Sequence, residues 1–241
     1  MALTGHMLAG LLKKLQPGQA IASMGYPDIA LSQEQLKNLL GDKFQSLQYR
    51  EDSAAIAKRH GMRPETLCPD AEHLFELCGV SLDVYDVIQE RGCEIVCDLN
   101  YPLPERVCGQ YDYVLDVGTA EHCFNIAQAL VNMACLVNVG GTVFHENPFN
   151  WGNHGFYGLN PTLYHDFYTD NGFEVEIQLV TRDGRACEAP ATKRFVMVGE
   201  EVNCLAVAKR LELRDIVFPV QTKYRKSLEA SCTPTPSIEK A

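Results

Sequence analysis

Short apolar runs alternate with amphipathic segments along most of the chain, and this alternation predicts its secondary structure. An apolar run of about four to eight residues that ends at Gly, Pro or Asn is typical of a buried strand. Strands are therefore predicted at residues 18–26, 81–87, 93–100, 111–117, 142–148, 173–180 and 203–211.

Helices are predicted between these strands. Ser32 and Gln35 form a capping-box pattern that begins one helix, and Gly41 ends it. The segment "PDIAL", which precedes this helix, is expected to be a loop. Helical spacing of apolar residues predicts further helices at residues 51–60, 70–78, 120–138 and 160–172, with Gly140-Gly141 ending the third of these.

Strands and helices in this order predict an α/β fold with a mostly parallel sheet. The strands at 173–180 and 203–211 are expected to close the sheet as an antiparallel pair. Residues 42–80 are interpreted as a helical insertion after the first helix. We expect residues 1–225 to form one domain, with no weight given to residues 1–6, and the Ser-, Thr- and Pro-rich segment 226–241 to be disordered.

Composition narrows the functional classes. The chain has 241 residues, of which 46% are hydrophobic, so one domain with a sizeable core is expected. The formal net charge of -10 argues against nucleic acid as a partner and favours a small-molecule ligand. The amphipathic N-terminal segment does not resemble a signal peptide, and no apolar run is long enough to span a membrane. We therefore expect a cytoplasmic protein.

Ten cysteines are present, and none is arranged as C-x-x-C. Zinc ribbons and thioredoxin-like redox sites are therefore not supported. In a cytoplasmic protein the cysteines are expected to be reduced and mostly buried.

Polar residues gather where the strand "YDYVLDV" ends. Asp116, Thr119, Glu121 and His122 follow a hydrophobic run within a few residues. In open parallel sheets, ligands bind beyond the carboxyl ends of the strands. This bend is therefore the first candidate for a functional site.

Three motifs on either side of this bend carry a family signal. They are Tyr111-Asp112-Tyr113-Val114, Ala120-Glu121-His122 and Val139-Gly140-Gly141. Together with "CDLNYPLP" and the closing "NGFEVEIQLV" and "NCLAVAKRL", they resemble class I S-adenosylmethionine-dependent methyltransferases over roughly residues 18–215. The resemblance implies a Rossmann-like fold and S-adenosyl-L-methionine as cofactor. The first loop departs from the family, because Gly25 stands alone where a G-x-G-x-G-type loop is usual.

The cofactor-binding residues follow from strand ends and from this resemblance. An acid at the end of the second strand can accept from both ribose hydroxyls, and Asp86 is preferred to Asp83 for this role. Asp98 and Leu99 resemble the adenine-edge pair of the family, although Asp98 could instead cap the turn before Pro102. The methionine portion is expected to contact the two loops formed by Gly25, Tyr26, Asp28, Asp116, Gly118 and Thr119.

Several of these residues have a simpler structural alternative. Asp86 could be a surface acid, and Tyr26 could pack on the insertion. Thr119 could cap the helix that begins at Ala120. Glu121 is expected to do no more than complement the dipole of that helix.

The acceptor side is predicted from His122 and from the segment after the fifth strand. His122, His145 and Tyr157 could take a proton from an acceptor hydroxyl or amine. Asn147, Trp151 and His154 are expected to line the acceptor pocket, unless the segment is simply a packed loop. A metal set is also conceivable, but it lacks tight ligand spacing, so no metal is predicted; its members would be His145, Glu146, His154, His165 and Asp166.

The expected function is methyl transfer to a small-molecule acceptor by in-line displacement at the sulfonium. One alternative keeps the cofactor as substrate, with its own amine attacking its γ-carbon to give azetidine-2-carboxylate and methylthioadenosine. Another is a non-catalytic partner domain. An NAD-dependent dehydrogenase is disfavoured because G-x-G-x-x-G is absent. The sequence does not define the acceptor or the oligomeric state.

Overall fold

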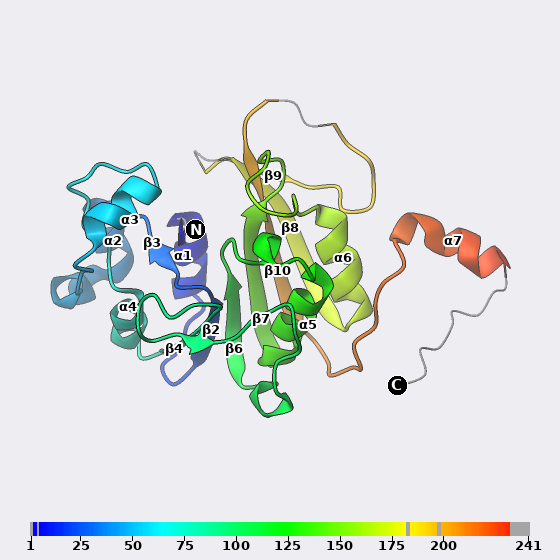
Figure 1. Ribbon diagram of the computed structural model, residues 1–241, viewed down its shortest axis with the longest axis horizontal. Coiled ribbons are helices and arrows are strands. Elements are labelled where there is room, and N and C mark those ends of the chain that lie inside the picture. The colour runs from blue at the N-terminus through cyan, green and yellow to red at the C-terminus, as the bar shows by residue number, and fades with distance from the viewer. Residues whose placement is uncertain (1, 4, 182–183, 197–198, 232–241) are drawn as a thin grey trace.

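The computed structural model describes residues 2–3, 5–181, 184–196 and 199–231, and these residues form an α/β structure around one large sheet (Figure 1). The sheet has eight strands in the described part of the chain, in the spatial order β5 (Ile95–Val96), β4 (Ser81–Asp86), β2 (Ala20–Met24), β6 (Tyr111–Asp116), β7 (Val137–Pro148), β10 (Val202–Arg210), β8 (Phe173–Thr181) and β9 (Ala186–Glu188). Neighbours from β5 to β7 pair in parallel, whereas β10 runs antiparallel to both β7 and β8. The predicted Rossmann-like fold with a closing antiparallel pair is confirmed.

Helices cover both faces of the sheet, because successive strand residues point to opposite sides. Ala22 and Val114 pack in one apolar cluster with α5 (Ile126–Leu136) and α6 (Pro161–Asp170). Ile21 and Leu115, each next in the chain to those residues, pack in a second cluster with α1 (Gly5–Leu12), α2 (Gln33–Leu40) and α4 (Ala71–Leu77). Figure 1 shows α5 and α6 on one side and α1 to α4 on the other.

The predicted helices of the first half are confirmed. The Ser32 hydroxyl accepts from the backbone N–H of Gln35, and the Gln35 side chain accepts from the backbone N–H of Ser32, so α2 begins with a complete capping box. The segment interpreted as an insertion contains the 3₁₀ helix Gly41–Ser46, α3 (Ser53–Arg59) and α4.

The long helix predicted over 120–138 is wrong in its limits. A 3₁₀ helix, Ala120–His122, stops at Cys123, which is extended. The Asn125 side chain then accepts from the N–H of Gln128 and begins α5 anew. The chain passes into β7 directly at Val137, so Gly140-Gly141 lies inside a strand and does not end a helix. A Cβ on Gly141 would lie 2.6 Å from the Asp112 carbonyl oxygen, which explains the glycine.

Smaller differences concern the ends of the chain and the loops. Within "PDIAL", β3 (Asp28–Ile29) pairs in parallel with β1 (Ala2–Leu3), so the expected loop is partly a strand. Leu3 is fully buried, although residues 1–6 were given no weight. α7 (Thr222–Ser231) extends into the segment predicted to be disordered, and residues 232–241 lie outside the described residues.

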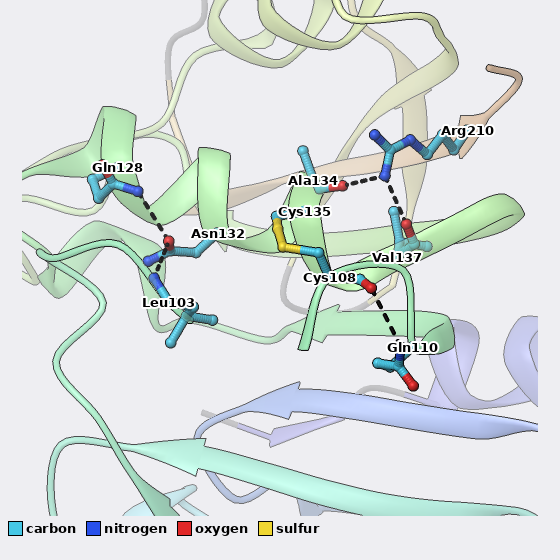
Figure 2. The surroundings of a disulfide bond; sticks show 9 residues. All are labelled: Leu103, Cys108, Gln110, Gln128, Asn132, Ala134, Cys135, Val137 and Arg210. Atoms are coloured by element: carbon cyan, nitrogen blue, oxygen red, sulfur yellow. Dashed lines mark hydrogen bonds between the residues drawn. A yellow bond between two sulfur atoms is a disulfide. The ribbon is translucent and has the colours of Figure 1, made fainter. Parts of the chain in front are cut away.

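Cys108 and Cys135 form a disulfide, so the expectation that all cysteines are reduced is wrong for this pair. Figure 2 shows the bond joining the turn before β6 to the last turn of α5. In the same region, the Arg210 guanidinium donates to the carbonyl oxygens of Ala134 and Val137, at 2.9 and 2.8 Å. The junction between α5 and β7 is therefore held by a covalent bond and by two hydrogen bonds to a charged group.

Among the described residues, we find no helix both long and apolar enough to cross a membrane.

Candidate functional site

The carboxyl ends of β2, β4 and β6 meet at Gly25, Asp86 and Thr119. Gly25 has a φ of 77°, which favours glycine, and a Cβ there would lie 3.0 Å from Thr119 Oγ1 and 3.7 Å from Asp86 Oδ2. The Thr119 hydroxyl donates to the Met24 carbonyl oxygen at 2.5 Å. Thr119 therefore ties two strand ends together, and its side chain does not make the helix cap that was its structural alternative.

A cavity of about 140 Å³ opens at these strand ends. It lies where the crossovers from β2 and β6 lead to opposite sides of the sheet, which is where ligands bind in doubly wound folds. Its walls come from the three strand ends, from α3 and from the loop after β4; the lining residues are Met24, Gly25, Tyr26, Pro27, Asp28, Arg59, Asp86, Glu90, Arg91, Glu94, Val117 and Thr119.

The two acids of β4 occupy different surroundings. Asp86 lines the cavity, and its Oδ1 accepts only a local bond from the N–H of Ile88, at 3.3 Å. Asp83 lies three residues earlier and accepts from the Tyr111 hydroxyl at 2.8 Å. Strand alternation thus leaves Asp86 as the acid that faces the cavity.

Asp98 and Leu99 lie after β5, away from the lining of this cavity. Asp98 is exposed, and its Oδ1 accepts from the backbone and side-chain amides of Asn100, at 2.9 and 2.7 Å. Leu99 is buried, and its carbonyl oxygen accepts from the Asn132 side chain. The second Asp98 oxygen is the polar atom that remains for a ligand at this edge.

The first loop is held by charged side chains from the insertion and from the loop after β4. The guanidinium groups of Arg50 and Arg91 lie 5.0 and 5.5 Å from the centre of the Tyr26 ring, so this ring already contacts two cations. Asp28 is buried and pairs with Arg91 at 3.3 Å and with His60 at 3.0 Å. Tyr26 and Asp28 both line the cavity, and both are held by positively charged or histidine side chains of this chain.

Asp116 lies in a buried polar network at the end of β6. Its Oδ1 accepts from the N–H groups of Thr119 and Ala120, and its Oδ2 lies 2.7 Å from His145 Nδ1. Burial alone would raise the pKa of Asp116, but the bonds from His145 and the backbone outweigh it, so the pKa is lowered. The other His145 nitrogen lies 2.6 Å from the Tyr168 hydroxyl. His145 is thus fully engaged within the core.

Glu121 is the second buried carboxyl of this region. Burial and the nearby Asp116 raise its pKa to about 7. Its Oε2 accepts from the Asn147 amide at 2.9 Å, while its Oε1 is buried without a hydrogen bond. From the sequence, Glu121 was expected only to complement a helix dipole, and its burial with a raised pKa was missed. The one sequence feature that could have indicated a functional acid was its position directly before His122, just after a buried strand.

The loop after β7 folds back over Glu121. Asn147 is buried, and its Oδ1 accepts from the Tyr164 hydroxyl, so it supports Glu121 and is closed to a substrate. His154 lies half-buried beside Trp151, with ring centroids 5.3 Å apart. The Tyr157 hydroxyl donates to the Phe124 carbonyl oxygen at 2.8 Å.

The residues of the alternative metal set, for which no metal was predicted, are not brought together. His145 contacts Asp116 within the core, whereas His165 pairs with its neighbour Asp166 at 2.8 Å on α6. His122 lies elsewhere, exposed beside Glu121 and His154.

Gly118, with a φ of 83°, turns the chain between Asp116 and Thr119.

Neither the protein-family models nor the curated protein sequences contain a match to this chain. Solved structures that resemble it include the CMeT domain of the citrinin polyketide synthase, with 11% identity over 85% of this chain and a TM-score of 0.46. Another is the trans-methyltransferase CalH in complex with SAH, with 14% identity over 84% of this chain and a TM-score of 0.44. This chain spans about half of each protein, 50% and 54% respectively.

A third similar structure is a mutant of the 16S rRNA (adenine(1408)-N(1))-methyltransferase from Catenulisporales acidiphilia. It has 11% identity, covers 89% of this chain and 96% of its own, and gives a TM-score of 0.42. The sequence identities and TM-scores of these three structures are low, so the fold is assigned from the strand order of this chain itself.

Proposed function

We propose that this protein is an S-adenosylmethionine-dependent methyltransferase that acts on a small-molecule acceptor. The observation that carries the proposal is the cavity at the switch point of the parallel sheet, with one glycine and one inward-facing acid at its strand ends. Of the three sequence motifs that resemble class I methyltransferases, Ala120-Glu121-His122 directly follows Thr119 at this cavity, while the other two lie at the start of β6 and of β7. The acidic chain favours a small acceptor over nucleic acid, and a cytoplasmic location remains our expectation.

The residues present fit the polar end groups of this cofactor. The space that a Cβ on Gly25 would fill lies between Thr119 and Asp86, so the backbone can be approached closely there. Asp86 would accept from the ribose hydroxyls, and Asp98 with the Leu99 N–H would hold the adenine edge. Arg59, at the cavity wall, would pair with the carboxylate of the methionine portion.

The bound cofactor supplies an electrophilic methyl group. The chain's own residues would hold the acceptor in line with that group and exclude water. His122 is the candidate proton acceptor that solvent reaches, with a side chain 49% exposed. Burial and the neighbouring His154 lower the pKa of His122, so its imidazole is neutral and able to accept a proton near pH 7. His145 is better suited to fixing Asp116, because both of its ring nitrogens have partners.

Binding of S-adenosylhomocysteine, measured by calorimetry, tests the proposal. We expect saturable binding that Asp86→Asn weakens at least about tenfold, because a carboxylate accepts more strongly than an amide. Asp83→Asn on the same strand is the matched control and should bind as the wild type does. Absence of binding at millimolar ligand would contradict the proposal and favour a non-catalytic domain.

The outcome of the chemistry is tested separately by mass spectrometry. Incubation with S-adenosylmethionine and no acceptor should leave the cofactor intact. Enzyme-dependent formation of methylthioadenosine would instead favour the intramolecular displacement that yields azetidine-2-carboxylate.

A further inference from the structure

Three potential ligand atoms converge beside the proposed cofactor site. Glu121 Oε1 lies 3.8 Å from His122 Nε2 and 3.6 Å from His154 Nε2. All three residues offer a ligand atom within 4.8 Å of the other two. In a tetrahedral zinc site with ligand bonds near 2.0 Å, two ligand atoms lie about 3.3 Å apart. The observed separations are therefore close to those of a metal centre.

The backbone brings these residues together from two segments. Glu121 and His122 follow each other in the 3₁₀ helix after β6, and His154 comes from the loop after β7. The N–H of Phe156 donates to the Glu121 carbonyl oxygen at 2.9 Å. A Cβ on Gly155 would lie 2.8 Å from the same oxygen, so a glycine is needed for the loop to approach. The convergence is thus built into the fold.

The polar atoms of the cluster are incompletely satisfied. Glu121 Oε1 and His154 Nε2 are both buried and make no hydrogen bond. Such atoms are costly in a folded protein unless a ligand or ion completes them. The other Glu121 oxygen is held by Asn147, which in turn accepts from Tyr164. Support of this kind, which orients a carboxylate through its second oxygen, is typical of metal-binding carboxylates.

We propose that Glu121, His122 and His154 bind a divalent first-row transition metal ion such as Zn²⁺. Two imidazoles and one carboxylate suit zinc, iron or cobalt better than magnesium or calcium, which prefer oxygen ligands. A four-coordinate ion held by three side chains keeps one position for water or a substrate oxygen. His122 is the most exposed of the three, so ions can enter from its side.

This proposal goes beyond methyl transfer and does not require it. The cluster begins two residues after Thr119, which lines the cofactor cavity. A metal ion there would be placed to bind an oxygen of the acceptor and to lower the pKa of an acceptor hydroxyl. With the ion bound, His122 would serve as a ligand and would not accept the proton itself.

Titration of the full chain with Co²⁺, after chelator treatment and without S-adenosylmethionine, tests the site. We expect one equivalent to bind with visible absorption bands, and Zn²⁺ to displace it. His122→Ala and His154→Ala should each abolish this saturable binding. Because His122 is exposed, its variant is expected to fold, which circular dichroism checks.

The matched control is His165→Ala, which removes a histidine that pairs with a carboxylate but has no third ligand. It should bind Co²⁺ as the wild type does. Failure of the wild type to bind one equivalent, or unchanged binding in either cluster variant, would overturn the proposal. Binding of S-adenosylhomocysteine in excess chelator is measured separately, so failure of the metal site and failure of the proposed function are distinguishable.

Discussion

Asp116 and Glu121 are both fully buried carboxyls, five residues apart, yet their surroundings shift their pKa values in opposite directions. Asp116 receives two backbone N–H groups and lies against His145, and its pKa is lowered. Glu121 receives one amide, faces the charge of Asp116, and its pKa is raised to about 7. Burial is common to both, so the neighbouring charge and the hydrogen-bond donors that each carboxyl meets decide which one stays ionised.

The difference separates a structural acid from a reactive one. Asp116 has its oxygens occupied and joins β6 to β7 through His145. Glu121 has an oxygen without a hydrogen bond, directed at two histidines. Groups with strongly perturbed pKa values and incomplete hydrogen bonding concentrate at functional sites. Four predictions test whether this contrast holds.

The largest loss of stability is expected from breaking the buried pair of Asp116 and His145. His145→Ala leaves Asp116 and Tyr168 buried without their shared partner, and should lower the free energy of unfolding by about 4 kcal/mol. Urea denaturation at pH 7 measures this loss. A loss no larger than that of His165→Ala on α6, expected to be below about 1 kcal/mol, would show that the network is not stabilising.

Glu121, the acid with an unbonded oxygen, should make the free energy of unfolding depend on pH. Protonated Glu121 contributes stability that is fully present below the unfolded-state pKa near 4.5 and is lost as pH rises through about 7. Glu121→Gln does not titrate. Its free energy of unfolding relative to wild type should therefore be about 2 kcal/mol more favourable at pH 8 than at pH 5. Both proteins are unfolded in urea with a chelator present, and equal differences at the two pH values would refute the raised pKa.

Loop closure over Glu121 is tested by adding one methyl group. In Gly155→Ala the new Cβ would meet the backbone of Glu121, so a loss of about 2 kcal/mol is expected from overpacking. Gly152→Ala, in the same loop, meets no atom within 4 Å and serves as the control. Thermal unfolding should separate the two variants by several degrees, and similar melting temperatures would mean that the loop does not rest on Glu121.

The smallest effect is expected at the first loop. Gly25→Ala and Gly18→Ala both place alanine at a positive φ, which costs about 1 kcal/mol each. A Cβ at Gly18 meets nothing within 4 Å, whereas one at Gly25 lies 3.0 Å from Thr119 Oγ1. Chemical denaturation should show a further small loss for Gly25→Ala alone, and calorimetry should show weaker binding of S-adenosylhomocysteine.

Much of the fold could be predicted from the sequence because hydrophobic periodicity and caps are local signals. Ser32 and Gln35 specified the start of α2, and strand alternation correctly separated Asp83 from Asp86. The error over 120–138 arose because helical spacing continues across Cys123, while the Asn125 cap and the β-branched Val137 override it.

The contacts of the candidate site could not be predicted in the same way. Asp116 and His145 lie on different strands, and His154 approaches Glu121 only because a glycine follows it in a folded loop. The Cys108–Cys135 bond likewise joins residues 27 positions apart that share no motif. Such pairings depend on strand register and loop closure, which a single sequence does not encode locally.

The direct passage of α5 into β7 has a mechanical consequence. No linker separates the helix from the strand after Leu136. The junction is instead fixed by the Cys108–Cys135 bond and by the hydrogen bonds of Arg210, so α5 and β7 are expected to move as one rigid unit (Figure 2). The helix α5 begins near the turn that bears Glu121, and the last residues of β7 include His145 and Asn147. A displacement of either element should therefore shift Glu121, His145 and Asn147 together, because no hinge lies between α5 and β7.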